Sequence, residues 1–246
     1  MSLIIAAAQS RSIPGDVPQN VFRHMRLATM AAEQGVQLLV FPELSLTGYE
    51  LSLAHRNAVR PDSSLLDPLR MLAKQACMTV VAGAPVPNEE GELYIAALAF
   101  GPDESVVVYA KEYVHESELG VFVCGPGGPT LRVQEAAVAL AICADAKHPE
   151  HAGRAAARGA DIYAAGVMIT EEDYPKKVDL LSNYAAQHRM AVLMANYSGW
   201  SGGLESAGKS AIWSEAGAVV AASTGTEEAL VVGARAEGAW KGMIFY

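Results

Sequence analysis

Glu43, Lys111 and Cys143 each follow a run of apolar residues that is typical of a buried strand. Open sheets present their ligand-binding and catalytic groups at the ends of such strands. A carboxylate, an ammonium and a thiol in these positions have complementary chemical uses. Taken singly, a Glu or Lys after a strand is usually a solvated charge and a Cys usually packs as a small hydrophobe.

The local sequences around the three residues match a known pattern. Phe-Pro-Glu-x-x-x-x-Gly-Tyr contains Glu43 and ends at Tyr49, Tyr-x-Lys ends at Lys111, and Ile-Cys-x-Asp-x-x-x-Pro-Glu contains Cys143. In this order the blocks closely resemble the signatures of the nitrilase, or carbon–nitrogen hydrolase, superfamily, in its amidase-like branch. The resemblance extends over nearly the whole chain, through the segments 118–125, 159–162, 195–199 and 208–212.

The resemblance implies a mechanism that suits these side chains. Glu43 would take the thiol proton of Cys143, because the thiolate is the nucleophile. Lys111 and the backbone N–H groups after Cys143 would stabilise the oxyanion. Glu118 matches an auxiliary glutamate, and either Glu43 or Glu118 would protonate the departing ammonia and activate water. The mechanism implies no metal and no organic cofactor.

Four further residues are predicted to bind substrate. Tyr49 closes the first block, and Ala144 and His148 replace aromatic residues that are frequent in the family, which alters the expected pocket wall. Lys147 occupies a position that is often arginine in members that act on carboxylate-bearing substrates. We hypothesise that Lys147 contacts a substrate carboxylate, although a solvated surface lysine is an equal alternative.

The predicted function is therefore hydrolysis of a small linear amide to a carboxylate and ammonia, as in ω-amidase-like or aliphatic amidase relatives. Hydrolysis of an N-carbamoyl amide is the nearest alternative, and nitrile hydrolysis is a more distant one. An inactive homologue that only binds a ligand is a third hypothesis, since fold alone never proves activity.

Three other signals carry less weight. Residues 203–210 match the phosphate-loop pattern, which would suggest a nucleotide hydrolase as the alternative from another class of function. The residues 210–213 favour a strand, however, where a phosphate loop needs a helix. His148 and His151 could belong to a metal cluster, yet two histidines at this spacing are more often a solvated helix face. Cys77 is predicted to be a core thiol, and Cys124 to lie near the pocket entrance or to pack.

The elements that must position these residues alternate between strands and helices, which predicts an α/β fold. By resemblance the architecture is the four-layer α-β-β-α sandwich of the superfamily, and one domain over residues 1–246 is the simplest account. Helices are expected at 19–34, with Val21, Met25, Ala28 and Ala32 on one face, and at 64–76, 150–158 and 176–188. Strands are expected at 3–8, 36–41, 79–82, 93–100, 105–110, 136–142, 161–164 and 191–195, with further strands within 210–232.

Composition narrows the class of partner. The chain has 246 residues, 51% of them hydrophobic, and a net charge of −9 without any Lys/Arg run, which argues against binding nucleic acid or anionic membranes. No apolar run is long enough for a membrane span, and the start lacks the features of a signal peptide. Three cysteines are a poor disulfide framework and fit a reducing compartment. We therefore expect a cytoplasmic protein with a small-molecule amide substrate and, by resemblance, a homodimer or larger homo-oligomer.

Overall fold

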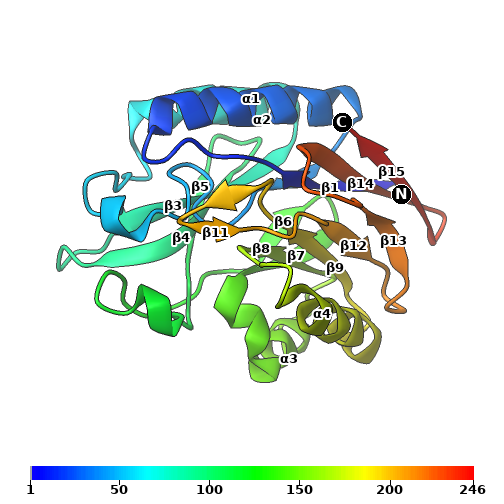
Figure 1. Ribbon diagram of the computed structural model, residues 1–246. Coiled ribbons are helices and arrows are strands. Elements are labelled where there is room, and N and C mark those ends of the chain that lie inside the picture. Colours follow the sequence, from blue (N-terminus) through cyan, green and yellow to red (C-terminus); the bar gives the residue numbers. More distant parts are fainter. Residues whose placement is uncertain (1) are drawn as a thin grey trace.

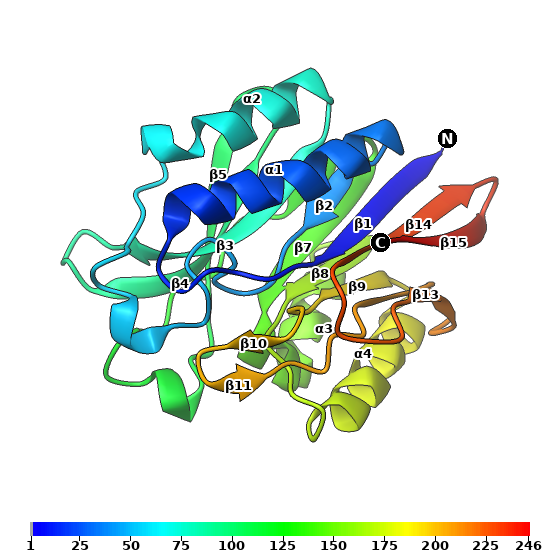
Figure 2. The same ribbon diagram turned by 45° about the horizontal axis from the view of Figure 1, so that its top comes forward.

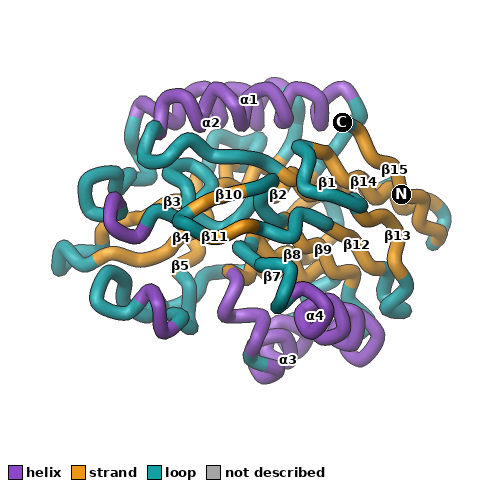
Figure 3. Tube along the Cα trace, viewed as in Figure 1, coloured by secondary structure: helices purple, strands orange, loops and turns teal. Residues whose placement is uncertain are grey.

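Two β-sheets packed face to face form the centre of the molecule, and helices cover both outer faces (Figure 1). The computed structural model describes residues 2–246. Figure 3 shows the helices as the two outer layers and the strands as the two inner ones. The observed architecture is the four-layer α-β-β-α sandwich that the sequence predicted.

The first sheet has seven strands and contains both ends of the chain (Figure 2). β1 pairs in parallel with β2 and antiparallel with β14, so the first strand of the chain lies beside the second-last one, and β15 pairs with β14 at the edge. In spatial order the strands are β15 (Ala239–Phe245), β14 (Ala229–Ala236), β1 (Leu3–Gln9), β2 (Leu38–Val40), β3 (Thr79–Pro87), β4 (Leu93–Phe100) and β5 (Val106–Ala110).

The second sheet has six strands, with β7, β8 and β9 parallel at its centre. In spatial order the strands are β13 (Val219–Ala222), β12 (Ala211–Trp213), β9 (Ala191–Ala195), β8 (Ile162–Gly166), β7 (Ala136–Ile142) and β6 (Leu131–Val133). A separate short hairpin is formed by β10 (Trp200–Ser201) and β11 (Leu204–Glu205).

Four α-helices form the outer layers, α1 and α2 over the first sheet and α3 and α4 over the second (Figure 1). Their bounds are α1 (Val17–Glu33), α2 (Asp67–Gln75), α3 (Pro149–Ala157) and α4 (Tyr174–His188). Four 3₁₀ turns are η1 (Leu51–Leu53), η2 (Ser64–Leu66), η3 (Glu116–Glu118) and η4 (Cys143–Lys147). None of the helices within residues 2–246 is long and apolar enough to cross a membrane.

Three apolar layers hold the sandwich together, one between the sheets and one under each pair of helices. The strands are apolar on both faces because each sheet is covered twice, once by the other sheet and once by helices. Burying one Leu, Ile or Val side chain contributes about 1.5–3 kcal/mol, so these layers dominate the stabilisation of the fold.

Two local expectations were wrong. β3 does not end before Pro85 but continues to Pro87. The carbonyl of Pro85 accepts a hydrogen bond from the backbone N–H of Val59, so the side of Pro85 that lacks an N–H faces away from β4 and no ladder bond is lost. The buried face of α1 is also rotated from the predicted one, because it includes the polar residues Asn20 and His24.

Candidate active site

The loop that carries Glu43 is held between two glycines, one from each sheet. A Cβ atom on Gly83 of β3 would lie 2.3 Å from the backbone nitrogen of Leu44, and one on Gly166 of β8 would lie 2.7 Å from the carbonyl oxygen of Phe41. Real Cβ atoms do not come this close to backbone atoms. The loop can therefore enter the space between the sheets because both positions lack a side chain.

Hydrogen bonds fix the same loop from β3, from α1 and from Tyr197, which follows β9. The Ser45 hydroxyl accepts the backbone N–H of Gly83 and lies 2.9 Å from Nε2 of the buried His24 on α1. The Tyr197 hydroxyl donates to the backbone carbonyl of Glu43 at 2.7 Å. The position of the Glu43 carboxylate is thus set by the fold and not by a free loop.

Lys111 lies directly after β5, and its backbone is fixed on both sides. Its N–H donates to the Ile95 carbonyl of β4 at 2.9 Å, and its carbonyl accepts the N–H of Gly125 at 2.6 Å. A Cβ atom on Gly125 would lie 2.4 Å from the Cβ of Ala110, so glycine permits this close crossing. The backbone directs the Lys111 side chain into the interior, where it is fully buried.

Cys143 stands at the turn between β7 and η4, in a left-handed conformation with φ of +41°. Such a conformation is unfavourable for a residue with a side chain and has to be held by its surroundings. The buried Asp145 holds this turn, because its carboxylate accepts the N–H of Ile142 at 2.9 Å.

The Asp145 carboxylate also links the turn at Cys143 to the segment that carries Lys111. It accepts the backbone N–H groups of Glu112 and Tyr113 at 3.1 and 2.9 Å, and the hydroxyl of Tyr109 at 2.7 Å. The sequence motif contains Asp145, but its positioning role was not recognised. The available signal was a carboxylate two residues after the cysteine in otherwise apolar surroundings.

Glu43, Lys111, Glu118 and Cys143, called the site cluster below, meet between the two sheets. Nζ of Lys111 lies 2.6 Å from Oε1 of Glu43 and 2.7 Å from each carboxylate oxygen of Glu118. The side chains of these three residues are fully buried, whereas Cys143 is partly exposed. The structure therefore brings together the four side chains that the sequence predicted to act together.

The two carboxylates of the cluster differ in how many hydrogen bonds their oxygens already accept. Glu118 accepts from Lys111 with both oxygens, from the Tyr49 hydroxyl at 2.8 Å and from the backbone N–H of His115 at 2.7 Å. Glu43 bonds Lys111 with one oxygen only. Its second oxygen, Oε2, is buried and accepts no well-formed hydrogen bond from residues 2–246.

Burial and the neighbouring charges shift the protonation of the cluster. Burial raises the pKa of Glu43 to about 7, while Lys111 opposes this rise and Glu118 adds to it. Burial and the nearby Glu43 carboxylate raise the pKa of Cys143 to about 12. For Lys111, burial lowers the pKa, but the surrounding negative charges outweigh it and the net pKa is raised. The resting thiol is thus protonated beside a carboxylate that titrates near neutral pH.

The Cys143 thiol has two polar neighbours. It lies 3.6 Å from the carbonyl oxygen of Met168, to which it can donate, and its contact with Glu43 is close enough to lower the pKa of that carboxyl. A thiol proton therefore has a short path to the Glu43 carboxylate.

The predicted substrate-binding residues lie in different environments. Tyr49 is buried and contacts Glu118, and Ala144 is buried next to Cys143. Lys147 is exposed. His148 stacks on Tyr113 with ring centroids 3.7 Å apart, and the contacts of the residues described include none between His148 and the site cluster.

Two predictions about neighbouring residues were wrong. His151 does not lie on a solvated face; its ring is buried between the hydroxyls of Tyr109 and Tyr163, at 2.8 and 2.9 Å. Cys77 is not a core thiol but is exposed, because it occupies a turn with φ of +50° between α2 and β3. Among residues 2–246, no group of three or more His, Cys, Asp or Glu side chains is arranged to hold a metal ion.

The phosphate-loop match does not have the structure that nucleotide binding needs. Residues 203–210 contain β11 and lead into strand β12, whereas a phosphate loop leads into a helix. Lys209 pairs with Glu171, and the Ser210 hydroxyl accepts the backbone N–H of Asn196. The sequence prediction of a strand at this place is confirmed.

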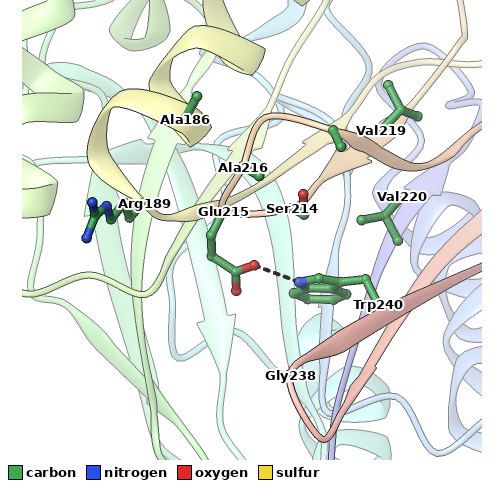
Figure 4. A pocket seen from close by; sticks show the side chains of 10 residues that line it. Ala186, Arg189, Ser214, Glu215, Ala216, Val219, Val220, Gly238 and Trp240 are labelled. Carbon is green, nitrogen blue, oxygen red and sulfur yellow. Dashed lines mark hydrogen bonds between the residues drawn. The ribbon is translucent and has the colours of Figure 1, made fainter.

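A surface hollow of about 770 Å³ has a lining that includes no residue of the site cluster. Figure 4 shows this hollow from close by. It is formed by the end of α4, the turn before β13 and the strand β15. Its floor includes Glu215, which accepts the indole N–H of Trp240 at 2.8 Å. The hollow is wide and open, and its lining includes Ser214 and Glu215 but no cysteine, lysine or histidine, so the chemistry points to the site cluster instead.

Comparisons with known proteins cover nearly the same residues as the fold. A sequence model of the family described as "Carbon-nitrogen hydrolase" matches residues 4–241. The structure is similar to that of an amidase of the nitrilase superfamily from Nesterenkonia AN1, with a TM-score of 0.84 and 28% identity over 94% of this chain and 90% of that one. That amidase has also been solved in complex with butyramide.

Two curated relatives are also similar to this chain over most of its length. A nitrilase from Pyrococcus abyssi is 28% identical over 218 residues, which are 85% of this chain and 80% of the relative. A protein named "Hydrolase in pqqF 5'region" from Pseudomonas protegens is 26% identical over 235 residues, 93% of this chain and 81% of the relative. These similarities include the segments that carry the whole site cluster.

Proposed function

The chain belongs to the carbon-nitrogen hydrolase family, and from this premise we propose that it hydrolyses a small linear amide to a carboxylic acid and ammonia. The reaction passes through a thioester on Cys143. One observation carries the assignment of roles: Glu43, whose carboxyl group the thiol contacts, has a buried oxygen with no hydrogen-bond partner among residues 2–246, while both oxygens of Glu118 already bond Lys111.

The first step forms the carbon–sulfur bond. Because the pKa of Cys143 is raised to about 12, the thiol needs a base, and Glu43 takes its proton as sulfur attacks the amide carbon. The carbonyl oxygen becomes an oxyanion. Lys111 and the backbone N–H groups after Cys143 stabilise it, and loss of one such donor typically costs about 2.7–4 kcal/mol.

The second half of the reaction restores the enzyme. Glu43 returns the proton to the amide nitrogen, the C–N bond breaks and ammonia leaves. Water then attacks the thioester and Glu43 accepts a proton from this water. The carbon–sulfur bond breaks, and Glu43 returns the proton to the departing sulfur, which gives the carboxylic acid, the free thiol and an ionised Glu43. Glu118 keeps Lys111 in place throughout the reaction. Both of its oxygens already accept hydrogen bonds from Lys111 and from a second donor, so neither is free to transfer a proton in this geometry.

An amide is favoured over a nitrile or an N-carbamoyl compound by the similar solved structures described above, which are those of an amidase. One mutant of the Nesterenkonia amidase has been solved in complex with butyramide, and another mutant carries the acetamide moiety of fluoroacetamide on its active-site cysteine. A site of the same fold and family in this chain suits a substrate of similar size.

The experiment that tests this function measures ammonia and carbon dioxide release from ω-amides, simple amides, N-carbamoyl amino acids and nitriles. Ammonia without carbon dioxide from the amides is expected. Carbon dioxide release would favour the N-carbamoyl alternative, and a binding-only homologue would release nothing. Cys143→Ala is the matched control, since full activity in that variant would overturn the mechanism.

We further propose that residues 1–246 form one domain and that the protein is a homodimer or larger homo-oligomer. The apolar layer shared by the two sheets supports the first proposal, because neither sheet could bury its inner face alone. A single cooperative unfolding transition and a molar mass of at least twice 25.9 kDa in light scattering are the expected results.

A further inference from the structure

Lys177 is a second buried lysine beside Cys143, and the sequence analysis did not identify it. It belongs to the first turn of α4, and only 5% of its surface is exposed. Its Nζ lies 3.5 Å from the backbone carbonyl oxygen of Cys143. The positive charge of Lys177 acts on the sulfur, because it lowers the pKa of the Cys143 thiol. The ammonium therefore faces the region where a substrate must lie.

No carboxylate pairs with Lys177 among residues 2–246, in contrast to Lys111, which has two. An ammonium has three donors, and this one makes a single long hydrogen bond. A buried cation without an anionic partner is costly, and the cost falls when an anion binds beside it. The cationic site is thus incomplete in the protein alone.

The groups around Lys177 carry charges of both signs. Burial lowers the pKa of Lys177, and the exposed Lys147 nearby lowers it further, while Cys143, Asp173 and Glu43 oppose the shift. The first turn of α4 contains no acidic residue, so the positive end of the helix adds to the two lysines. Asp173, the N-cap residue of α4, has an exposed side chain and makes no capping bond.

We propose that Lys177 binds a carboxylate of the substrate, so that the preferred substrates are monoamides of dicarboxylic acids. This inference rests on the proposed amide hydrolysis and narrows its substrate class. In this arrangement the amide carbon of the substrate lies at the sulfur of Cys143, and the carboxylate at the other end of the substrate lies at Lys177. Lys147 then adds a second positive charge at the exposed rim, as its sequence position suggested.

The test compares one charged and one neutral amide of similar length, glutaramate and pentanamide, in the wild type and in Lys177→Met. The quantity measured is the ratio of kcat/KM for the two amides. Loss of a charge-assisted contact is expected to lower this ratio about 10- to 100-fold, mainly through KM for glutaramate. Lys177→Arg is expected to restore part of it.

Lys176→Met is the matched control. Lys176 is the exposed neighbour of Lys177 in the same helix turn, and its substitution removes the same charge. The ratio should stay near the wild-type value in this variant. If Lys177 only supports the Cys143 carbonyl, Lys177→Met will lower kcat/KM for both amides by the same factor. The ratio would then stay unchanged, which overturns the proposal.

Failure of the proposed function is distinguishable from failure of this inference. A wild type that hydrolyses pentanamide but not glutaramate keeps the function and refutes the role of Lys177. If the wild type hydrolyses neither amide, the carboxylate site is tested by calorimetry, which measures the binding of glutaramate to Cys143→Ala. Binding that is lost in Cys143→Ala/Lys177→Met supports the carboxylate site, and no binding in either variant rejects it.

Discussion

Replacing Glu118 with Gln should separate the two glutamates of the site by their different roles. Both oxygens of Glu118 lie 2.7 Å from Nζ of Lys111, and the same carboxylate accepts from Tyr49 and His115. A glutamine keeps one accepting oxygen and places an NH₂ donor at the other. Lys111 then loses one charge-assisted bond and a neighbouring negative charge.

The size of the effect follows from the contact that is lost. A hydrogen bond to a charged group contributes about 1.5–3 kcal/mol, and each 1.4 kcal/mol is a factor of ten, so kcat should fall about 10- to 100-fold. The pH profile should move as well. The negative charge of Glu118 raises the pKa of Glu43, so its removal lowers that pKa from about 7.

The sign of the pH effect is set by the role of Glu43 as a base. The carboxylate must be ionised to take the thiol proton, so kcat/KM rises with pH through the Glu43 pKa. The wild-type acidic limb is expected near pH 7, and the limb of Glu118→Gln at lower pH.

Ammonia release measured from about pH 5 to 9 tests both effects, with Glu116→Gln on the exposed side of the same turn as control. An acidic limb that stays in place in Glu118→Gln, or a kcat equal to that of the wild type, would refute the reasoning.

Three further substitutions test how the site is held. Gly83→Ala brings a Cβ to 2.3 Å from the backbone of Leu44 and should destabilise the fold by about 1–3 kcal/mol in denaturant unfolding; an unchanged midpoint contradicts this. Asp145→Asn leaves buried donors short of acceptors, so both the Tm and kcat should fall, and retained activity would count against it. Tyr197→Phe removes the bond to the Glu43 carbonyl and should cost about 0.5–1.5 kcal/mol, a loss that calorimetry would detect.

The sequence alone predicted the family, the layered fold and the members of the site cluster. The resemblance identified Glu43, Lys111, Glu118 and Cys143, and the structure brings their side chains together. Strand and helix positions could be read because long apolar runs and helical periodicity are local features of the chain. β15, which is only partly buried and lacks such a run, was missed for the same reason.

Only the tertiary structure decided which polar residues are buried and what they contact. Lys177 stands 34 positions from Cys143 and has the local pattern of an ordinary helix residue, so nothing nearby in sequence marked it. His151 and Cys77 were assigned to the wrong environments for the same reason. Burial is set by segments that are distant in sequence, and a residue's own neighbours cannot reveal which segment will cover it. The different roles of Glu43 and Glu118 likewise emerge only when their hydrogen bonds to the same ammonium are seen together.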